Sequence, residues 1–370
     1  MKKRCMFIIF LFLICAILIA FNHKTKYLVD EQSIATFIDG SKSDSFPEKG
    51  TVAFEKAVCD GSANIYWDKD TWGLYVTNLN EKTKCNLYFK TLENAVTKIT
   101  NLASIDTVNI ATDDPDNNIR YIGANPNNYV YFNCDDYNNQ TSDTCEKWRI
   151  IGVFNNVEKE DGTKENLIKI IKDETIGNIA WNTNIVNDWN NSSLQSYLNE
   201  GKYYSSSLKT SQTQDAIEKV IWNIGGSSNS EDATAEIFYK SERGTEVYSE
   251  RSTTWLGKIA LMYPSDYGYA TSGGQINTRK SCLNSFMSSW NSMNECFEND
   301  YLYKLYYHQW SLTHYVQSMG GIFRIYRGGH ISWIGAKDEG SGVRPTLFLK
   351  SDISIGVGDG TEVNPYQLNI

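Results

Sequence analysis

The sequence predicts an α+β protein of antiparallel strands and two helices, preceded by a small all-β module and an N-terminal transmembrane segment. Three observations lead to this prediction. An uncharged apolar run opens the chain, short runs of β-forming residues alternate with turn clusters through most of the remaining residues, and two stretches near the middle change to a helical period. A length of 370 residues suggests two or more folded units.

Residues 1–26 have the composition of a membrane-targeting segment. Three basic residues at positions 2–4 precede an uncharged apolar run over residues 5–21, whose length lies between that of a signal-peptide core and that of a full membrane span. A small-x-small cleavage signal fits poorly at Ala20, because Leu18 lies two residues before it. We therefore expect an uncleaved signal-anchor in the cell membrane, with the C-terminal part extracellular. The alternative is a removed signal and a secreted protein.

The number and spacing of the cysteines are typical of an exported protein. Six of the eight cysteines lie outside the apolar segment and fall into three local couples, which predicts three short-loop disulfides. The predicted pairs are Cys59–Cys85, Cys134–Cys145 and Cys282–Cys296. No Cys-x-x-Cys occurs and the few histidines lie elsewhere, so neither a zinc site nor another metal or cofactor is expected.

The net charge of the chain limits the classes of partner that it is expected to bind. The net charge is −9, and residues 1–26 hold five basic and no acidic side chains, so the remainder carries −14. An acidic surface disfavours phosphate backbones, and no nucleic-acid partner is expected. The chain holds 23 Tyr and 10 Trp, which suits ligand contacts as well as core packing, and packing is the preferred interpretation for any single tyrosine.

Two segments precede the larger unit. Residues 27–48 show no sustained period and end in Ser, Asp, Pro and Gly, which predicts a stalk. Residues 49–91 alternate β-formers with polar residues between turn clusters, which predicts three or four short strands. The stretch "CDGSANIYWDKDTWGLYVTNLNEKTKCNLYFKT" resembles a small repeated, Cys-bridged β-module of surface proteins from low-GC Gram-positive bacteria. This resemblance implies the role of a spacer or a structural cap.

Residues 92–118 are expected to form a connector helix and a loop. In "TLENAVTKITNLA", Thr91 can cap a helix whose apolar residues share one face. These residues are Leu92, Ala95, Val96, Ile99 and Leu102. The following loop contains Asp113, Asp114 and Asp116, but it lacks the spacing of a calcium loop and is interpreted as a solvated turn.

The larger unit is expected to span residues 119–370. The runs "NNYVYFN", "CEKWRIIGVFNN" and "NLIKIIKDE" predict an antiparallel meander. The segments "NDWNNSSLQSYLNEGKYYSSSLK" and "SQTQDAIEKVIWNIGG" then change to a helical period. Near the end, "IFRIYRGG", "HISWIGA" and "GVRPTLFLK" predict two turn-linked strands and a final strand, and the "GDG" and "PYQLNI" of the C-terminus predict a tight turn and one more strand.

The order of these segments resembles a domain of unknown function of Firmicutes surface proteins. The resemblance covers residues 125–350 and includes "KWRIIGVF", "DWNNSSLQSYLN", "WLGKIALMYPSDYG", "QWSLT" and "SGVRPTLFLK". Its layout is similar to that of C-type-lectin-like folds, including the formylglycine-generating branch, in which an Arg-Gly-Gly segment and a tryptophan precede a closing Gly-x-Arg strand. Here these elements are Arg327, Gly328, Gly329, Trp333 and Gly342-Val343-Arg344. Trp310 and Trp333 are expected in the core, and Arg344 in a structural role.

No complete catalytic constellation is found. The chain has no Gly-x-Ser-x-Gly, P-loop, G-x-G-x-x-G or H-E-x-x-H, and its histidines are interpreted as surface or hydrogen-bonded residues. Residues 297–370 contain no cysteine, so the likeness to formylglycine-generating enzymes implies no catalysis here. We expect that the chain is not an enzyme. It is expected to be a binding or envelope-structural protein whose ligand is an unknown protein or glycan. The alternative is a secreted hydrolase or modifying enzyme that acts on envelope polymers.

A candidate recognition face lies in residues 263–310. In C-type-lectin-like folds the long loops before the final strands form the exposed recognition face, and this region is dense in Tyr, Asn, Ser and Trp. The candidate binding residues are Tyr267, Tyr269, Arg279 and Trp290. The alternative is that the aromatic residues cover the core beneath a long loop.

The first prediction concerns topology. The basic flank and the poor cleavage site lead us to expect that the full chain stays in the membrane fraction, with its original N-terminus, when cells are fractionated. N-terminal sequencing of the protein checks this expectation. A mature N-terminus near Asn22, found on protein in the culture supernatant, would show that the segment is a removed signal.

Overall fold

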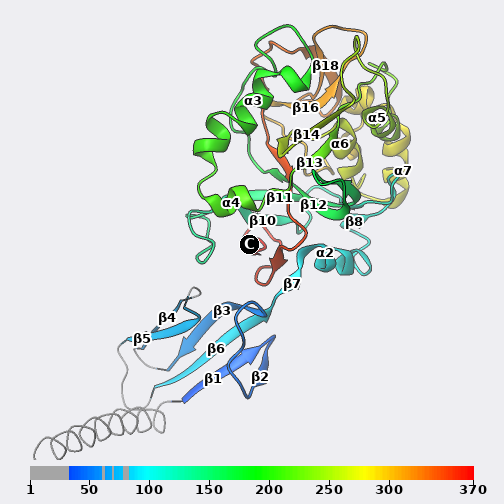
Figure 1. Cartoon of the computed structure of the whole chain (residues 1–370). Coiled ribbons are helices and arrows are strands. Elements are labelled where there is room, and N and C mark those ends of the chain that lie inside the picture. The colour runs from blue at the N-terminus through cyan, green and yellow to red at the C-terminus, as the bar shows by residue number, and fades with distance from the viewer. Residues whose placement is uncertain (1–32, 61–62, 69–70, 78–82) are drawn as a thin grey trace, which may run out of the picture. The chain divides into compact units, whose positions relative to one another are not determined.

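The computed structural model describes residues 33–60, 63–68, 71–77 and 83–370 and has an α+β architecture (Figure 1). The chain divides into two compact units, with the boundary between Leu92 and Glu93. The predicted membrane segment lies outside the described residues. Within the described ranges, no helix has the length and the apolar character needed to cross a membrane.

The small unit is built from strands alone in the part that the structure describes. These are β1 (Ser33–Ile38), β2 (Ser41–Ser43), β3 (Val52–Cys59), β4 (Asn64–Asp68), β5 (Gly73–Thr77) and β6 (Lys84–Thr91). One sheet has the order β2-β1-β6-β3, and β4 and β5 form a separate hairpin. Three or four strands were predicted within residues 49–91, and four are present, β3 to β6.

The prediction of a stalk over residues 27–48 is wrong for residues 33–43, which contain strands β1 and β2. Strand β1 pairs in parallel with β6 over six residues, from Ser33 opposite Lys84 to Ile38 opposite Phe89. The pattern was missed because "SIATFI" is short and its neighbours are polar. Its partner is also distant in the sequence, and a parallel pairing leaves no hairpin turn signal between the two strands.

Aromatic rings form the core of the small unit. Trp67 is 6% exposed and packs on Leu87 and Phe89, with ring centroids 5.1 Å apart for the Trp67–Phe89 pair. Trp72 meets Trp67 edge to face at 5.0 Å and donates its indole N–H to the carbonyl of Pro47 at 2.8 Å. These contacts hold the β4–β5 hairpin against the four-stranded sheet.

The predicted connector helix belongs to the large unit. Helix α2 (Ala95–Ala103) begins four residues after Thr91, and Asn94 is its N-cap, accepting a hydrogen bond from the Thr97 amide at 3.2 Å. Ala95 and Ile99 are buried in the core of the large unit. Thr91 is instead the last residue of β6, so the prediction of the helix is confirmed but its cap and its connecting role are wrong.

The predicted meander forms the centre of the large unit. The sheet has the order β15-β20-β12-β11-β9-β8, with β10 also beside β11. Its strands are β8 (Ile110–Ala111), β9 (Ile119–Tyr121), β10 (Tyr129–Phe132), β11 (Glu146–Glu158), β12 (Lys164–Lys172), β15 (Ile259–Ala260) and β20 (Thr346–Phe348). Gly152 lets β9 approach β11, because a Cβ there would lie 1.9 Å from the carbonyl oxygen of Ile119.

After α2, the large unit contains more helices than the two predicted. They are α3 (Ser193–Asn199), α4 (Ser211–Asp215), α5 (Ala235–Glu242), α6 (Pro264–Ala270), α7 (Ile276–Asn284) and α8 (Asn294–Phe297), with short turns η1 (Trp189–Asn191), η2 (Tyr203–Ser207) and η3 (Met287–Ser292). Leu194 and Leu198 of α3 are buried as expected. The second predicted helix is wrong: it ends at Asp215, and β13 (Val220–Asn223) follows and pairs with β14 (Thr254–Gly257).

The predicted C-terminal strands are confirmed. A second sheet of the large unit has the order β18-β17-β16-β19, made of β16 (His308–His314), β17 (Gly321–Ile325), β18 (Ile331–Gly335) and β19 (Ser341–Gly342). Gly329 turns the β17–β18 hairpin with a φ of 86°. Trp310 is buried as predicted, but Trp333 is 44% exposed and stacks on Tyr315 at 5.0 Å. Trp333 is outside the core because β18 is the edge strand of its sheet.

Arg344 has the predicted structural role. Its guanidinium is buried and donates to the carbonyl oxygens of Lys172, at 2.9 Å, and Leu302, at 3.1 Å. It also donates to Oε1 of Gln309 at 2.8 Å. The side chain thereby joins β12, the loop after α8 and β16.

The cysteine pairs are the predicted ones. Disulfides join Cys59 to Cys85, Cys134 to Cys145, and Cys282 to Cys296. The first bridges β3 and β6 at directly paired positions, and the third links α7 to α8.

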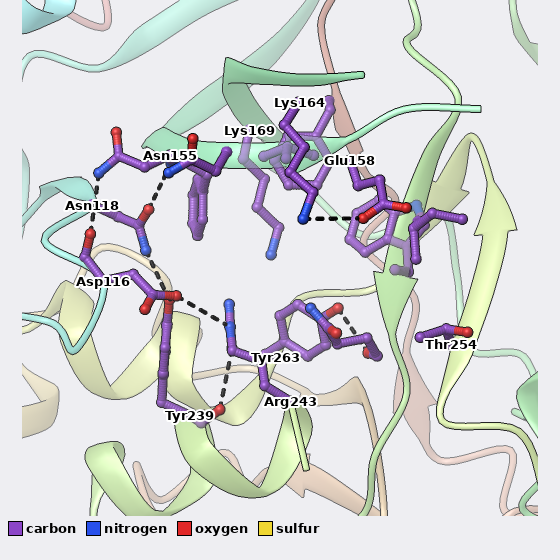
Figure 2. Close-up of a pocket in the computed structure, with 17 residues that line it drawn as sticks. Asp116, Asn118, Asn155, Glu158, Lys164, Lys169, Tyr239, Arg243, Thr254 and Tyr263 are labelled. Carbon is purple, nitrogen blue, oxygen red and sulfur yellow. Dashed lines mark hydrogen bonds and ion pairs between the residues drawn. The ribbon is translucent and has the colours of Figure 1, made fainter. Parts of the chain in front are cut away.

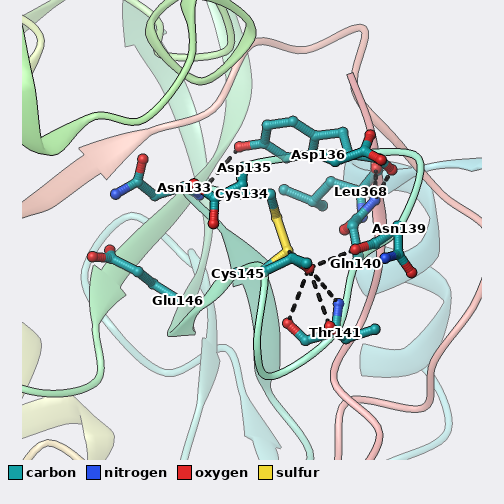
Figure 3. The surroundings of a disulfide bond; sticks show 12 residues. Asn133, Cys134, Asp135, Asp136, Asn139, Gln140, Thr141, Cys145, Glu146 and Leu368 are labelled. Atoms are coloured by element: carbon teal, nitrogen blue, oxygen red, sulfur yellow. Dashed lines mark hydrogen bonds between the residues drawn. A yellow bond between two sulfur atoms is a disulfide. The ribbon is translucent and has the colours of Figure 1, made fainter.

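The second disulfide supports the C-terminus (Figure 3). Gln140, in the loop that the Cys134–Cys145 bond closes, donates to the carbonyl of Leu368 at 2.6 Å and accepts from the Leu368 amide at 3.0 Å. The predicted final strand is present as β22 (Leu368–Asn369), which pairs with β21 (Ser354–Ile355), and β21 pairs with β7 (Glu93–Asn94). The ends of the large unit therefore meet in one small sheet.

We expect Cys59 and Cys85 to be critical for the small unit. Replacing both by Ser in the full chain removes a bridge that spans 26 residues, and we expect it to lower the free energy of unfolding of this unit by about 3 kcal/mol. The small core makes that loss proportionally large. Hydrogen–deuterium exchange read by mass spectrometry should show faster exchange in residues 33–91 and unchanged exchange in residues 93–370.

The matched control replaces Cys134 and Cys145 by Ser, which should affect the large unit only. Unchanged exchange in residues 33–91 of the first variant, or free thiols at Cys59 and Cys85 in the wild-type protein, would contradict the expectation.

Candidate binding pocket

The large unit contains a pocket of about 510 Å³ between the central sheet and α5 (Figure 2). Its walls come from β11, β12, β13, β14 and β20, from the region of α5, and from the start of α6. The lining residues are Asp116, Asn118, Phe154, Asn155, Asn156, Val157, Glu158, Lys164, Lys169, Ile221, Trp222, Asn223, Tyr239, Arg243, Thr254, Tyr263 and Phe348. The volume is that of a site for a small molecule.

Lys169 forms the floor of the pocket. It lies in the middle of β12, where both faces of the strand are covered, and its side chain is fully buried. The ammonium donates a short hydrogen bond to Oδ2 of Asp266. Asp266 also accepts from the Tyr263 amide at 2.9 Å and from Nη1 of Arg120 at 2.9 Å. A buried charge needs such partners, since taking it out of water without them is very costly.

The ion pairs continue behind the floor. Nε of Arg120 donates to Oδ2 of Asp114 at 2.6 Å, and both side chains are buried. Arg120, on β9, therefore lies between two carboxylates, and Asp266 between two cations. Asp114 was expected in a solvated turn, and this expectation is wrong because the carboxylate neutralises a buried arginine. Among the described residues, no group of three or more His, Cys, Asp or Glu could hold a metal ion.

Aromatic rings surround the ammonium of Lys169. The ring centroid of Tyr263 lies 4.3 Å from Nζ, and those of Phe154, Trp222 and Phe348 lie at 5.0, 5.4 and 5.7 Å. Ring faces attract a cation but solvate it less well than water does. Burial therefore lowers the pKa of Lys169 to about 8, although Asp266 opposes the shift.

A second charged group forms one wall. The guanidinium of Arg243 lies 3.4 Å from the ring centroid of Tyr239, donates to the carbonyl of that residue at 3.3 Å, and approaches Oδ2 of Asp116 at 3.8 Å. The Tyr239 hydroxyl donates to the same Asp116 oxygen at 2.5 Å and accepts from Nδ2 of Asn118 at 2.9 Å. This wall is a preformed hydrogen-bonded network, which requires little ordering when a ligand binds.

Glu242 lies behind Arg243 and is fully buried. It accepts from the Ser265 amide at 3.0 Å and from the Ser265 hydroxyl, and Arg243 Nη1 lies 3.3 Å from its Oε2. Burial raises the pKa of Glu242 to about 7, although Arg243 and the hydrogen bonds from Ser265 oppose this shift. The carboxyl does not line the pocket.

The rim of the pocket carries one exposed ion pair and several amides. Lys164 and Glu158, on paired strands, are 3.3 Å apart and largely exposed. Among the described residues, the side chains of Asn156 and Asn223 make no hydrogen bond. The side chain of Asn155 uses only its Nδ2, which donates to backbone carbonyls. The rim can therefore both donate hydrogen bonds to a ligand and accept them from it.

The four predicted binding residues lie elsewhere and are buried. Tyr267 and Trp290 have no exposed surface, Tyr269 is 3% exposed and Arg279 6% exposed. The prediction of an exposed recognition face made of these side chains is therefore wrong, and the alternative, that the aromatic residues cover the core, is confirmed. The sequence pattern was misleading because residues 263–310 are not one long loop but contain α6, α7 and α8.

Packing explains the burial of these side chains. Tyr267 and Trp290 pack with ring centroids 5.4 Å apart, and the Tyr267 hydroxyl donates to the carbonyl of Gly329 at 2.7 Å. Arg279 donates to both carboxylate oxygens of Asp113, at 3.0 and 2.7 Å, and also to the Thr271 carbonyl. Arg279 thereby fixes α7 against the loop before β9.

The three histidines among the described residues are hydrogen-bonded or contact an aromatic ring. His314 is 5% exposed, and burial lowers its pKa to about 4. Nε2 of His314 accepts from the Tyr248 amide at 3.4 Å, and Nδ1 of His308 accepts from the Arg327 amide at 3.1 Å. The ring of His330 contacts that of Tyr326, with centroids 4.8 Å apart and an angle of 33° between the ring planes. None of these side chains lines the pocket.

Comparisons of the chain with protein-family models, with curated proteins and with solved structures found no match. The interpretation of the pocket therefore depends on its own geometry.

The sequence analysis missed Lys169 and Asp266, although a signal exists for each. Lys169 interrupts the apolar run "LIKII" of a strand that is buried on both faces, and a charge at such a position requires a partner. Asp266 lies at the third position of α6 in "YPSDYG", after a proline that favours a helix start. That the two residues meet could not be read from the sequence, since 97 positions separate them.

We predict that Glu242 makes the stability depend on pH. Its carboxyl has a pKa of about 7 in the folded protein, against 4.5 in the unfolded chain, so the folded state holds the proton more tightly. The associated stability is fully present below pH 4.5 and is lost as the pH rises through 7, by about 3 kcal/mol in total. Glu242→Gln should remove this decline in chemical-unfolding curves recorded from pH 4.5 to 8.

The control for this experiment is Glu236→Gln on the exposed side of the same helix, which should keep the decline of the wild type. If the free energy of unfolding changes with pH in the same way in the wild type and in Glu242→Gln, the carboxyl has the same pKa in the folded and unfolded states, and the prediction is contradicted.

Proposed function

We propose that this is a non-catalytic bacterial cell-surface protein whose large unit binds a small polar ligand in the pocket above Lys169. In this proposal residues 1–26 hold the chain to the membrane, and the rest lies outside the cell. The three disulfides support an extracytoplasmic location, because disulfides form and persist in oxidising compartments. The small unit serves as a spacer, and the large unit has a C-type-lectin-like layout.

The observation that carries the proposal is the construction of the pocket. Polar and charged groups from strands and helices distant in the sequence converge on one concave space, and each cation has a carboxylate partner. Buried aromatic rings fix the positions of these groups. Ligand sites are commonly concave, apolar in their walls and equipped with a few placed polar groups.

One observation favours the alternative of an enzyme acting on envelope polymers. Asp116 and Glu158 both line the pocket, and pairs of carboxyl groups hydrolyse glycosidic bonds in many enzymes. Each of the two already has a partner, Tyr239 for Asp116 and Lys164 for Glu158. We therefore prefer binding. Formation of a product from a bound polymer would reverse that choice, provided that both Asp116→Asn and Glu158→Gln abolish it.

We expect Thr254→Trp to block the pocket. Thr254 lines it from β14, is exposed, and its hydroxyl makes no hydrogen bond among the described residues, so the larger side chain should occupy the entrance without breaking a contact. Binding of the full-length protein to a glycan array and to a panel of surface proteins, followed by calorimetry with any hit, checks this. We expect at least a ten-fold loss of affinity, about 1.4 kcal/mol.

The matched control is Thr183→Trp, at an exposed threonine that does not line the pocket. It should bind like the wild type. A hit that binds equally to both variants would place recognition on another surface and overturn the proposed role of the pocket.

A further inference from the structure

We propose that the ligand of the pocket is uncharged and multiply hydroxylated, as is a sugar unit of a neutral glycan. This inference rests on the proposed function and specifies the chemical class of the ligand. It depends on three properties of the pocket: the pairing of its charges, the open hydrogen-bonding positions at its rim, and the rings in its walls.

The charges of the pocket are already neutralised. The cations that line it are Lys164, Lys169 and Arg243. Lys164 pairs with Glu158 at 3.3 Å, Lys169 with Asp266, and Arg243 with Asp116 at 3.8 Å and Glu242 at 3.3 Å. With Arg120 and Asp114 included, four cationic side chains face five carboxyl groups, and one of the five, Glu242, lies outside the lining of the pocket and has a pKa raised by burial to about 7. No cation is left without a nearby carboxyl group, so the pocket offers no net attraction to an anion.

A charged ligand would have to compete with these internal pairs. A carboxylate that approached Lys169 would meet Asp266, which already accepts from Lys169, Arg120 and the Tyr263 amide. Repulsion between two like charges in a partly buried site is several-fold stronger than in water. An amine would meet Lys164 and Arg243 in the same way. A neutral ligand avoids both costs.

Hydroxyl groups suit paired charges better than either kind of ion does. Each hydroxyl can donate to one partner and accept from another, so a single group can lie beside the Lys164–Glu158 pair or beside Asp116 and Arg243, in contact with both members. The amides of Asn156 and Asn223, with Oδ1 of Asn155, offer further donors and acceptors. A ligand with several hydroxyls could satisfy many of these groups at once.

The walls supply apolar contact for the carbon face of such a ligand. The rings of Tyr239 and Tyr263 line the pocket together with the indole of Trp222. In Figure 2 the side chains of Lys164, Lys169 and Arg243 point toward the space that these walls enclose. Hydrogen bonds at the edges and apolar contact on a face match a ring that carries hydroxyls at its periphery.

The test compares three classes of probe on the full-length protein: neutral oligosaccharides, oligosaccharides that contain uronic acids, and oligosaccharides of unacetylated amino sugars. We expect binding to the neutral class alone, with little change in affinity between low and high salt, because no ion pair forms between protein and ligand. Binding confined to the uronic acid or the amino sugar class would overturn the inference.

Two rim variants give an independent readout. Lys164→Gln and Glu158→Gln change the charge by one unit in opposite directions and keep a polar side chain of similar length. For a neutral ligand both should weaken binding by roughly five-fold, the effect of one lost hydrogen bond. For an anion, Lys164→Gln should weaken binding and Glu158→Gln strengthen it, and for a cation the reverse. Opposite signs, or no change in either variant, would overturn the inference.

The controls separate this inference from the proposed function. Lys240→Gln and Glu236→Gln make the same charge changes at an exposed pair, 2.5 Å apart, that does not line the pocket, and they should leave affinity unchanged. If Thr254→Trp abolishes binding but the rim variants show opposite signs, the pocket is the site and only the ligand class is wrong. If Thr254→Trp has no effect on a neutral hit, the pocket is not the site and the proposed function fails.

Discussion

The fold of the large unit depends on the buried carboxylate of Asp266. Its two oxygens accept hydrogen bonds from Arg120 on β9, from Lys169 on β12 and from the backbone at the start of α6. One group thereby joins two strands of the central sheet to a helix that packs on it. Burial alone would raise the pKa of Asp266, but the two cations outweigh this effect and lower it. The carboxylate is therefore charged, and its removal would leave two cations buried without their shared partner.

The same interaction shapes the pocket. Lys169 is held in place from below by Asp266 and from the sides by aromatic rings, so the polar floor is fixed before any ligand arrives. Arg243 is held in a similar way by Tyr239, Asp116 and Glu242. A pocket with fixed polar groups distinguishes ligands by where their donors and acceptors lie, because its own groups do not rearrange to suit a poor match.

The local parts of this fold were predictable from the sequence. The meander β10–β11–β12, the β17–β18 hairpin and the three disulfides were predicted because each depends on neighbouring residues with strong patterns. Interactions between distant residues were not predictable. The residues around Ile217 and Val220 have helical spacing, but pairing of β13 with β14 overrides it. In the same way Trp290 and Tyr267 have the composition of a recognition loop, yet they fill the core. The pocket was missed because its residues come from six or more separate segments.

The parallel pairing of β1 with β6 has a mechanical consequence for a chain that is held at its N-terminus. The small unit is entered through β1 and left through β6, and these two strands lie side by side and run in the same direction. In a chain anchored at its N-terminus, as proposed above, tension on the large unit would pull the two strands past each other in shear. Six paired positions would then bear the load together, instead of opening one after another as in a peeled hairpin. A unit built in this way resists extension better than one whose terminal strands form a hairpin.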